Sequence, residues 1–85
     1  MIQRDVTVKD LAKTYKNPIP EIIQTASVFS SSIYLISNNR RINAKSIMGL
    51  MVLKPNEGDV ITIEAQGADE KEAADALEAF LLCRK

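Results

Sequence analysis

Two asparagines in the middle of the chain, Asn38 and Asn39, restrict the fold more than any other sequence feature. They separate two short segments of extended character, the apolar run Ser32–Ser37 and the segment Arg40–Asn43. Asparagine tolerates a positive φ better than other non-glycine residues, and a tight two-residue hairpin turn requires that conformation. We therefore predict an antiparallel hairpin that turns at these two residues.

Two further segments, residues 2–8 and 59–65, alternate between apolar and polar side chains. A period of two with β-branched residues is typical of a strand that buries one face. The expected buried faces are apolar apart from Arg4: Ile2, Val6 and Val8 in the first segment, and Ile61, Ile63 and Ala65 in the second. Residues 9–16 are polar and aperiodic apart from Leu11, so we expect a loop there.

Helix start signals occur at two places before residue 54. Asn17 is a good N-cap and Pro18 suits the first helical position, so a helix is predicted to follow. Its apolar residues recur at spacings of three and four: Ile19, Ile22, Ile23 and Ala26. Ser46 is the expected N-cap of a second helix of about two turns, which ends near Leu53.

A third helix is predicted after Asp69, because Asp69 and Glu72 have the spacing of a capping box. Its expected buried stripe consists of large and small apolar residues: Ala73, Leu77, Phe80 and Leu81. Arg84 and Lys85 are expected to complement the negative end of this helix. The single cysteine, Cys83, is interpreted as a small apolar filler.

The predicted order of elements is β-α-β-β-α-β-α. A tight hairpin together with helices between strands predicts an α+β fold, in which helices cover one face of an antiparallel sheet. At 85 residues, the chain is expected to form a single domain spanning residues 1–85.

The complete absence of histidine limits the possible chemistry. It excludes imidazole acid–base catalysis, histidine metal ligands and phosphohistidine. With one cysteine and scattered acidic residues, we expect no metal, no cofactor and no enzymatic activity.

The 11 basic and 11 acidic residues balance, so direct nucleic-acid binding is not expected. Residues 1–20 show no signal-peptide core and no apolar run could span a bilayer, which favours a cytoplasmic protein without a membrane partner.

Three stretches carry a resemblance to a known family. They are Asn-Ala-Lys-Ser-Ile-Met-Gly-Leu-Met at residues 43–51, Gln-Thr-Ala-Ser at 24–27 and Ala-Gln-Gly-Ala-Asp-Glu at 65–70. With them, the whole chain resembles HPr, the phosphocarrier protein of the bacterial sugar phosphotransferase system. The resemblance implies an open-faced β-sandwich, in which three helices cover one face of a four-stranded antiparallel sheet.

The chain departs from the family's phosphoryl-transfer motif, a histidine followed two and three residues later by arginine and proline. Tyr15 takes the histidine position and Asn17 the arginine position, whereas Pro18 matches. A phosphotyrosine ester is much lower in energy than phosphohistidine, and asparagine lacks the bidentate fork of arginine. The resemblance therefore implies that no residue is catalytic and that carrier activity is absent. Tyr15 is expected to be a surface aromatic in a loop or, with Lys13 and Lys16, part of a new contact surface.

Ser46 matches the family's regulatory serine, which an ATP-dependent serine kinase of the HPr-kinase type phosphorylates in Gram-positive relatives. The modified relative then acts as corepressor for a catabolite-control transcription factor. A chain that keeps this serine and lacks the histidine is similar to the catabolite-repression HPr-like type, Crh. The resemblance implies phosphorylation at Ser46 and contacts with HPr-binding partners through Lys45, Ile47, Met48, Met51, Tyr15 and Pro18.

Alternatives remain for this region and for the whole chain. From the residues alone, Ser46 can be only a helix cap, with Met48 and Met51 as core residues. A degenerate phosphocarrier and an unmodified decoy that occupies HPr partners are the other functions considered. The oligomeric state is left open between a monomer and a homodimer that exchanges its first strand.

Overall fold

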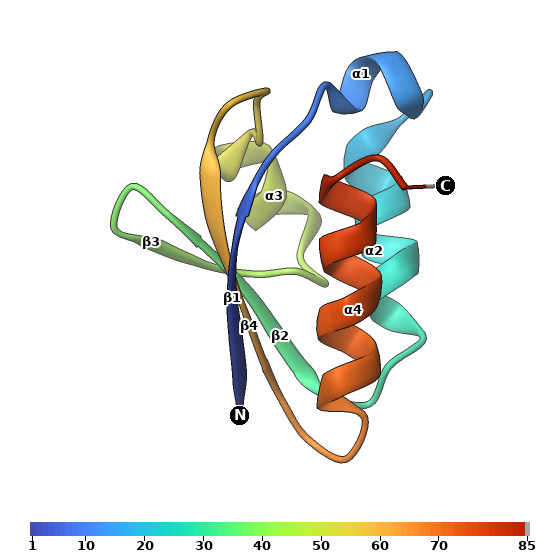
Figure 1. Cartoon of the computed structure of the whole chain (residues 1–85), viewed down its shortest axis with the longest axis vertical. Helices are drawn as coiled ribbons and strands as arrows, with labels where there is room; N and C mark the ends of the chain where they lie inside the picture. Colours follow the sequence, from blue (N-terminus) through green and yellow to red (C-terminus); the bar gives the residue numbers. More distant parts are fainter. Residues whose placement is uncertain (85) are drawn as a thin grey trace.

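The computed structural model describes residues 1–84, and Lys85, predicted to lie at the end of the last helix, falls outside the described residues. Figure 1 shows a sheet with helices packed on one side of it. In chain order, the elements are β1 (Ile2–Thr7), α1 (Leu11–Thr14), α2 (Pro18–Ser27), β2 (Ser32–Ser37), β3 (Arg40–Asn43), α3 (Ile47–Leu53), β4 (Val60–Gln66) and α4 (Glu70–Leu81).

The strands form one antiparallel sheet in the order β1-β4-β2-β3. Ser37 of β2 pairs with Arg40 of β3, so the turn between them has two residues. Both turn residues have a positive φ, 53° at Asn38 and 65° at Asn39. This is the backbone conformation that a two-residue hairpin of type I′ requires, and the predicted hairpin is confirmed.

Helices α2, α3 and α4 cover one face of the sheet (Figure 1). α4 packs on β1 and β4, α3 packs on β3, and α2 lies against both α3 and α4. Between the layers lies one core of apolar side chains, the largest of which are Ile22, Ile33, Leu35, Leu50, Ile61, Ile63, Leu77 and Leu81. The predicted α+β class and open-faced β-sandwich are therefore confirmed.

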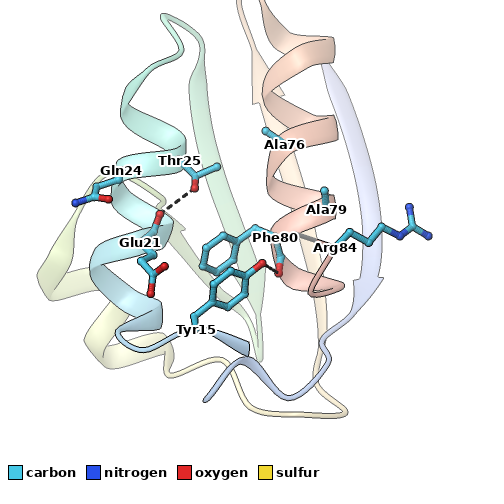
Figure 2. A pocket seen from close by; sticks show the side chains of 8 residues that line it. All are labelled: Tyr15, Glu21, Gln24, Thr25, Ala76, Ala79, Phe80 and Arg84. Carbon is cyan, nitrogen blue, oxygen red and sulfur yellow. Dashed lines mark hydrogen bonds between the residues drawn. The ribbon is translucent and has the colours of Figure 1, made fainter. Parts of the chain in front are cut away.

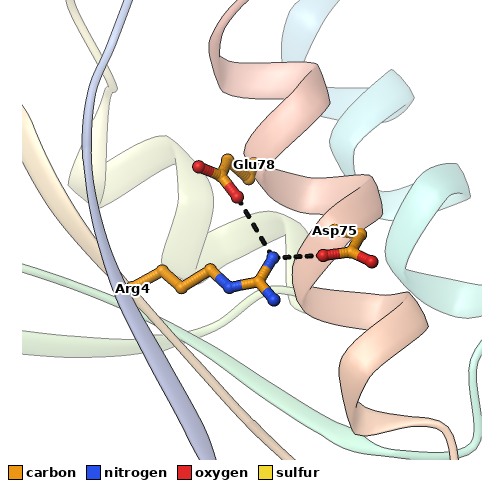
Figure 3. Close-up of polar contacts among 3 residues, drawn as sticks. All are labelled: Arg4, Asp75 and Glu78. Atoms are coloured by element: carbon orange, nitrogen blue, oxygen red, sulfur yellow. Dashed lines mark hydrogen bonds and ion pairs between the residues drawn. The ribbon is translucent and has the colours of Figure 1, made fainter.

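Arg4 lies on the face of β1 that is otherwise apolar, and α4 explains how a cation is accommodated there. The Arg4 guanidinium forms hydrogen-bonded ion pairs with Asp75 and, at 3.1 Å, with Glu78, both on α4 (Figure 3). The hydrogen bond from Arg4 lowers the pKa of Asp75. Because these side chains are partly exposed, water screens the pairs, and their main effect is to orient β1 on α4.

The expectation of a loop throughout residues 9–16 is wrong, because one helical turn, α1, lies within it. The Asp10 carboxylate accepts a hydrogen bond from the Lys13 backbone N–H at 3.3 Å and so caps this turn. Leu11 is buried in the core, which fixes α1 against the rest of the domain. A cap residue followed by one apolar residue was the local signal for this turn.

The capping box predicted for α4 is also wrong, although Asp69 does occupy the N-cap position. The Asp69 carboxylate accepts hydrogen bonds from Ser30 and Ser31 backbone N–H groups, both at 2.9 Å, and from the Ser31 hydroxyl. These hydrogen bonds lower the pKa of Asp69 to about 2, and the bond from the Ser31 hydroxyl contributes most to this shift. In a capping box Glu72 would accept from the Asp69 backbone N–H, but the glutamate that accepts a backbone N–H at this helix start is Glu70, from Gly67 at 3.2 Å.

Candidate functional site

Ser46 lies immediately before α3 and is its N-cap. Its backbone is extended, with φ −106° and ψ 116°, and its Oγ accepts a hydrogen bond from the Gly49 backbone N–H at 3.2 Å. One otherwise unpaired amide of the first helical turn is thereby satisfied. The predicted cap is confirmed, and the Ser46 side chain remains partly exposed.

The turn before Ser46 is held by Asn43. Its side-chain Oδ1 accepts from the Lys45 backbone N–H at 2.8 Å, and its carbonyl oxygen accepts from the Ser46 backbone N–H at 3.0 Å. The Lys45 side chain extends away from this turn, and its Nζ donates to the carbonyl oxygen of Phe29 at 2.8 Å. Lys45 therefore joins the start of α3 to the chain segment that follows α2.

The inner side of α3 fixes the helix on the domain. Leu50 is fully buried, and Gly49 lies so close to β3 that an added Cβ would be 2.5 Å from Cγ2 of Ile42. That distance is shorter than any normal carbon–carbon contact, so this close approach of helix and strand requires glycine. Leu50 and Gly49 therefore fix the inner side of α3 against the sheet edge.

The outer side of α3 presents large apolar side chains to solvent. Met48 is 77% exposed, Met51 and Val52 are each 55% exposed, and Ile47 is 52% exposed. We call these four residues the exposed apolar face of α3. The alternative that Met48 and Met51 belong to the core is therefore wrong. Val52 was missed from the sequence, although it follows Met48 by four residues and so shares its side of the helix.

Tyr15 is buried, so the expectation of a surface aromatic, alone or with Lys13 and Lys16, is wrong. Only 6% of Tyr15 is exposed. Its ring stacks on that of Phe80 in α4, with centroids 3.9 Å apart and an interplanar angle of 4° (Figure 2). The Tyr15 hydroxyl donates to the Phe80 carbonyl oxygen at 3.0 Å, and burial is the main cause that raises the pKa of this phenol. Its partners come from the far end of the chain, which local sequence patterns do not reveal.

The carbonyl that Tyr15 contacts belongs to the C-terminal end of α4. The Cys83 backbone N–H also donates to the Phe80 oxygen, and the Arg84 N–H donates to the Ala79 oxygen. Together with a left-handed φ of 59° at Cys83, these bonds form a Schellman motif. The Phe80 carbonyl therefore accepts two hydrogen bonds, one from the backbone of the Schellman motif and one from the Tyr15 hydroxyl.

A shallow pocket of about 290 Å³ lies beside the stacked rings, between α2 and α4 (Figure 2). Its wall on the α2 side includes Glu21 and Gln24, and its floor includes Tyr15 and Phe80. Glu21 also accepts a hydrogen bond from the backbone N–H of Asn17 at 2.9 Å. Asn17 is the N-cap of α2 as predicted, but its own side chain makes no capping hydrogen bond.

Pro18 is the first residue of α2 and lies near the end of α3. It lines a pocket of about 330 Å³ together with apolar residues of α1 and α2 and with the segment that follows α3, including Leu11, Ile19, Lys54 and Pro55. The structure therefore brings Pro18 close to the segment that follows the exposed apolar face of α3, whereas Tyr15 is turned into the α2–α4 layer.

Within residues 1–84, no cluster of three or more Cys, Asp or Glu side chains is arranged to hold a metal ion. None of the helices formed by these residues combines the length and the apolar composition needed to cross a bilayer.

Comparisons with known proteins agree with the fold and identify the family. The family model for the PTS HPr component phosphorylation site matches residues 2–82. The HPr-like protein Crh of Halalkalibacterium halodurans is 40% identical over 81 residues, which cover 95% of this chain and 96% of that protein.

Solved structures give the same result. HPr from Thermoanaerobacter tengcongensis has a TM-score of 0.84 and 40% identity, covering 95% of this chain and 91% of that one. Crh of Bacillus subtilis, whose crystal structure shows a dimer with a swapping domain, has a TM-score of 0.72 and 37% identity, covering 95% and 93%. Since the family match spans almost the entire chain and both structures share its fold, this chain belongs to the HPr family of the phosphotransferase system.

Proposed function

We propose that this chain is a non-catalytic, HPr-like regulatory protein of carbon metabolism that is switched by phosphorylation at Ser46. The observation that carries this proposal is the position of Ser46: a partly exposed hydroxyl directly before four exposed apolar side chains on α3. In the modification, the Ser46 oxygen forms a bond to the γ-phosphorus of ATP, ADP leaves, and the hydroxyl proton is lost.

The physical effect of the phosphate would be local. It adds between about 1.5 and 2 negative charges at neutral pH, next to Ile47 and Met48. A partner that buries these side chains must then also accommodate or pair the phosphate. Methionine side chains adapt to differently shaped surfaces, so the exposed apolar face of α3 suits more than one partner.

Phosphoryl-carrier activity is not part of the proposal. The chain contains no histidine, and the Tyr15 hydroxyl is engaged with the Phe80 carbonyl inside the α2–α4 layer. A phosphoryl group on that oxygen would break the hydrogen bond and bring charge into a buried site. Burial and the loss of the family's arginine at Asn17 therefore both argue against transfer through this position.

The partners proposed are a serine kinase of the HPr-kinase type and a catabolite-control transcription factor or another HPr-binding protein, in the cytoplasm. Lys45, Ile47, Met48 and Met51, with Pro18 near the end of α3, are the proposed contacts. The buried Tyr15 is proposed only as support for the loop before Pro18. A strand-exchanged homodimer beside the monomer is supported by the swapped dimer of the Bacillus subtilis relative and by the edge position of β1.

The direct test is incubation of the protein with Mg-ATP and a kinase of this type, followed by intact-mass spectrometry. We expect a gain of one phosphate in the native protein and in Ser32→Ala, which changes an exposed serine of β2. Ser46→Asn should gain none, and it keeps the helix cap because asparagine is an equally good N-cap. A phosphate gain in Ser46→Asn, or none in the native protein when the same kinase modifies a known HPr, would refute the proposal.

Two further measurements separate the alternatives. A decoy would bind the same partners with the same affinity in the native, Ser46→Asn and Ser46→Asp forms, whereas a switch requires the native and Ser46→Asp forms to differ. A degenerate carrier would acquire a label from phosphoenolpyruvate and the first kinase of the phosphotransferase system. We expect no such label.

A further inference from the structure

Lys45 connects two segments that are distant in sequence, and its contact is well defined. The Nζ–O distance to the Phe29 carbonyl is 2.8 Å, and the Lys45 side chain is partly buried. The backbone around it is held by Asn43, through the bonds to the N–H groups of Lys45 and Ser46. With the backbone held in this way, Lys45 can exchange its contact by movement of its side chain.

The Phe29 carbonyl lies just beyond the C-terminal end of α2, whose C-cap is Val28. Helix ends of this kind have carbonyl groups without intrahelical partners and a partial negative charge, which a cation stabilises. The last turn of α2 contains no basic residue of its own. Lys45 supplies this missing cation from the start of α3.

We propose that phosphorylation of Ser46 transfers the Lys45 ammonium from the Phe29 carbonyl to the phosphate, and so releases the C-terminal end of α2. This rests on the proposed modification of Ser46 and adds to it a second site of structural change. The two residues are adjacent, with Cα atoms about 3.8 Å apart, so the side chain can reach the phosphate by rotation. The ammonium is charged in both contacts, but the phosphate carries about 1.5 to 2 negative charges whereas the carbonyl is neutral, so Coulomb attraction favours the phosphate.

The released segment has a surface role of its own. Val28, the neighbour of Phe29, is 76% exposed. Phe29 itself packs partly against the core. Without the Lys45 contact, Phe29 would still be held by this packing and by the bond from its N–H to the Ala26 carbonyl at 3.2 Å. The two residues that follow it remain fixed by the Asp69 carboxylate, so the change is confined to the Val28-Phe29 segment. A partner that contacts both α3 and the end of α2 would then detect the modification at two places.

The test uses the full chain with phosphoserine incorporated at position 46 during synthesis, so that no kinase is needed. The first readout is the ¹³C chemical shift of the Phe29 carbonyl. We expect Lys45→Gln to move this resonance in the unmodified protein. Phosphorylation of the native sequence should move it in the same direction, and phosphorylated Lys45→Gln should show no additional change. An unchanged Phe29 resonance on phosphorylation would overturn the proposal.

The second readout is the titration of the phosphate by ³¹P NMR. If Lys45 pairs with it, the second pKa of the phosphate should be lower in the native sequence than in Lys45→Gln by roughly half a pH unit, a modest shift because the site is partly solvated. Lys54→Gln, which removes the same charge at the other end of α3, should leave the titration at the native position. Equal pKa values in the native and Lys45→Gln proteins would contradict the transfer.

Failure of this proposal is distinguishable from failure of the proposed function. If a kinase modifies Ser46 but Phe29 and the phosphate titration do not respond to Lys45, only the transfer is wrong. If no kinase modifies Ser46 while the synthetic phosphoprotein shows both responses, the regulatory function is wrong and the contact exchange stands as a property of the fold.

Discussion

Tyr15 and Phe80 lie face to face, with ring centroids 3.9 Å apart, and the hydroxyl of the first donates to the carbonyl of the second. The two residues come from opposite ends of the chain. Their contact fastens the loop between α1 and α2 to the last turn of α4. We propose that Tyr15, which the family resemblance matches to the reactive histidine, serves here to stabilise the fold.

The hydroxyl of Tyr15 should contribute measurably to stability. Tyr15→Phe keeps the ring stack and loses one buried hydrogen bond, so we expect a loss of about 1 kcal/mol in the free energy of unfolding. Tyr15→Ala also removes the ring, and we expect a loss of about 3 kcal/mol or more. Urea unfolding followed by circular dichroism measures both. Tyr34→Phe, a change in a partly exposed tyrosine, should cost less than Tyr15→Phe, and the opposite order would contradict this assignment.

The lowered pKa of Asp69 predicts how the free energy of unfolding depends on pH. Its pKa is about 2 in the folded protein, below the ordinary 3.8, so the unfolded chain takes up a proton more readily. The stabilisation is therefore complete above about pH 4 and is lost as the pH falls toward about 2. Ser31→Ala removes the hydroxyl that contributes most to this shift.

The measurement for Asp69 is the urea midpoint at about pH 6 and about pH 2.5. The midpoint should fall less between these two values in Ser31→Ala than in the native protein, because less of the acid-sensitive stabilisation is present to be lost. Ser32→Ala, the same change at the neighbouring exposed serine, should behave like the native protein. If the urea midpoint falls equally in Ser31→Ala and in the native protein, the Asp69 contacts do not cause the loss of stability in acid.

Removal of the Ser46 side chain should destabilise the protein independently of any modification. Ser46→Ala loses the bond to the Gly49 N–H, at a cost of about 1 kcal/mol, which corresponds to a decrease of about 4–8 °C in Tm for a domain of this size. Ser46→Asn should melt within about 2 °C of the native protein. Differential scanning calorimetry decides this, and equal melting of Ser46→Ala and the native protein would mean that the cap contributes nothing.

Met48 should matter for binding and hardly at all for folding. Because 77% of it is exposed, Met48→Ala should change the free energy of unfolding by less than about 0.5 kcal/mol. If Met48 is buried in a partner interface, the same change should weaken binding by about tenfold. Titration calorimetry with an HPr-binding partner tests this. Val60→Ala, a change in an exposed apolar residue of β4, is the matched control and should bind like the native protein.

Sequence patterns predicted those elements whose determinants are local. The Asn38-Asn39 turn and the Ser46 cap each depend on residues within a few positions, and both were found as predicted. The one-turn helix α1 was missed because Leu11 is its only residue buried in the core, too few for a periodic pattern.

Local sequence patterns did not predict the contacts between segments that are distant in the chain. Tyr15 is surrounded in sequence by polar residues, and its burial depends on Phe80. The Asp69 carboxylate fits a local capping box, yet it accepts from Ser30 and Ser31, which the fold brings beside it. In the same way, the contact of Lys45 with Phe29 follows from how α2 and α3 pack.

The strand order has a consequence for the folding pathway. β1 occupies an edge of the sheet, and all its partners lie in β4, near the other end of the chain, whereas β2 and β3 are joined by a two-residue turn. Closing the longer loop costs more chain entropy. We therefore expect the hairpin to form early and β1 to dock last, after a stage in which one edge of β4 is still unpaired. At that stage β4 can pair with the first strand of its own chain or of another copy, so the protein concentration during refolding should set the yield of strand-exchanged dimer.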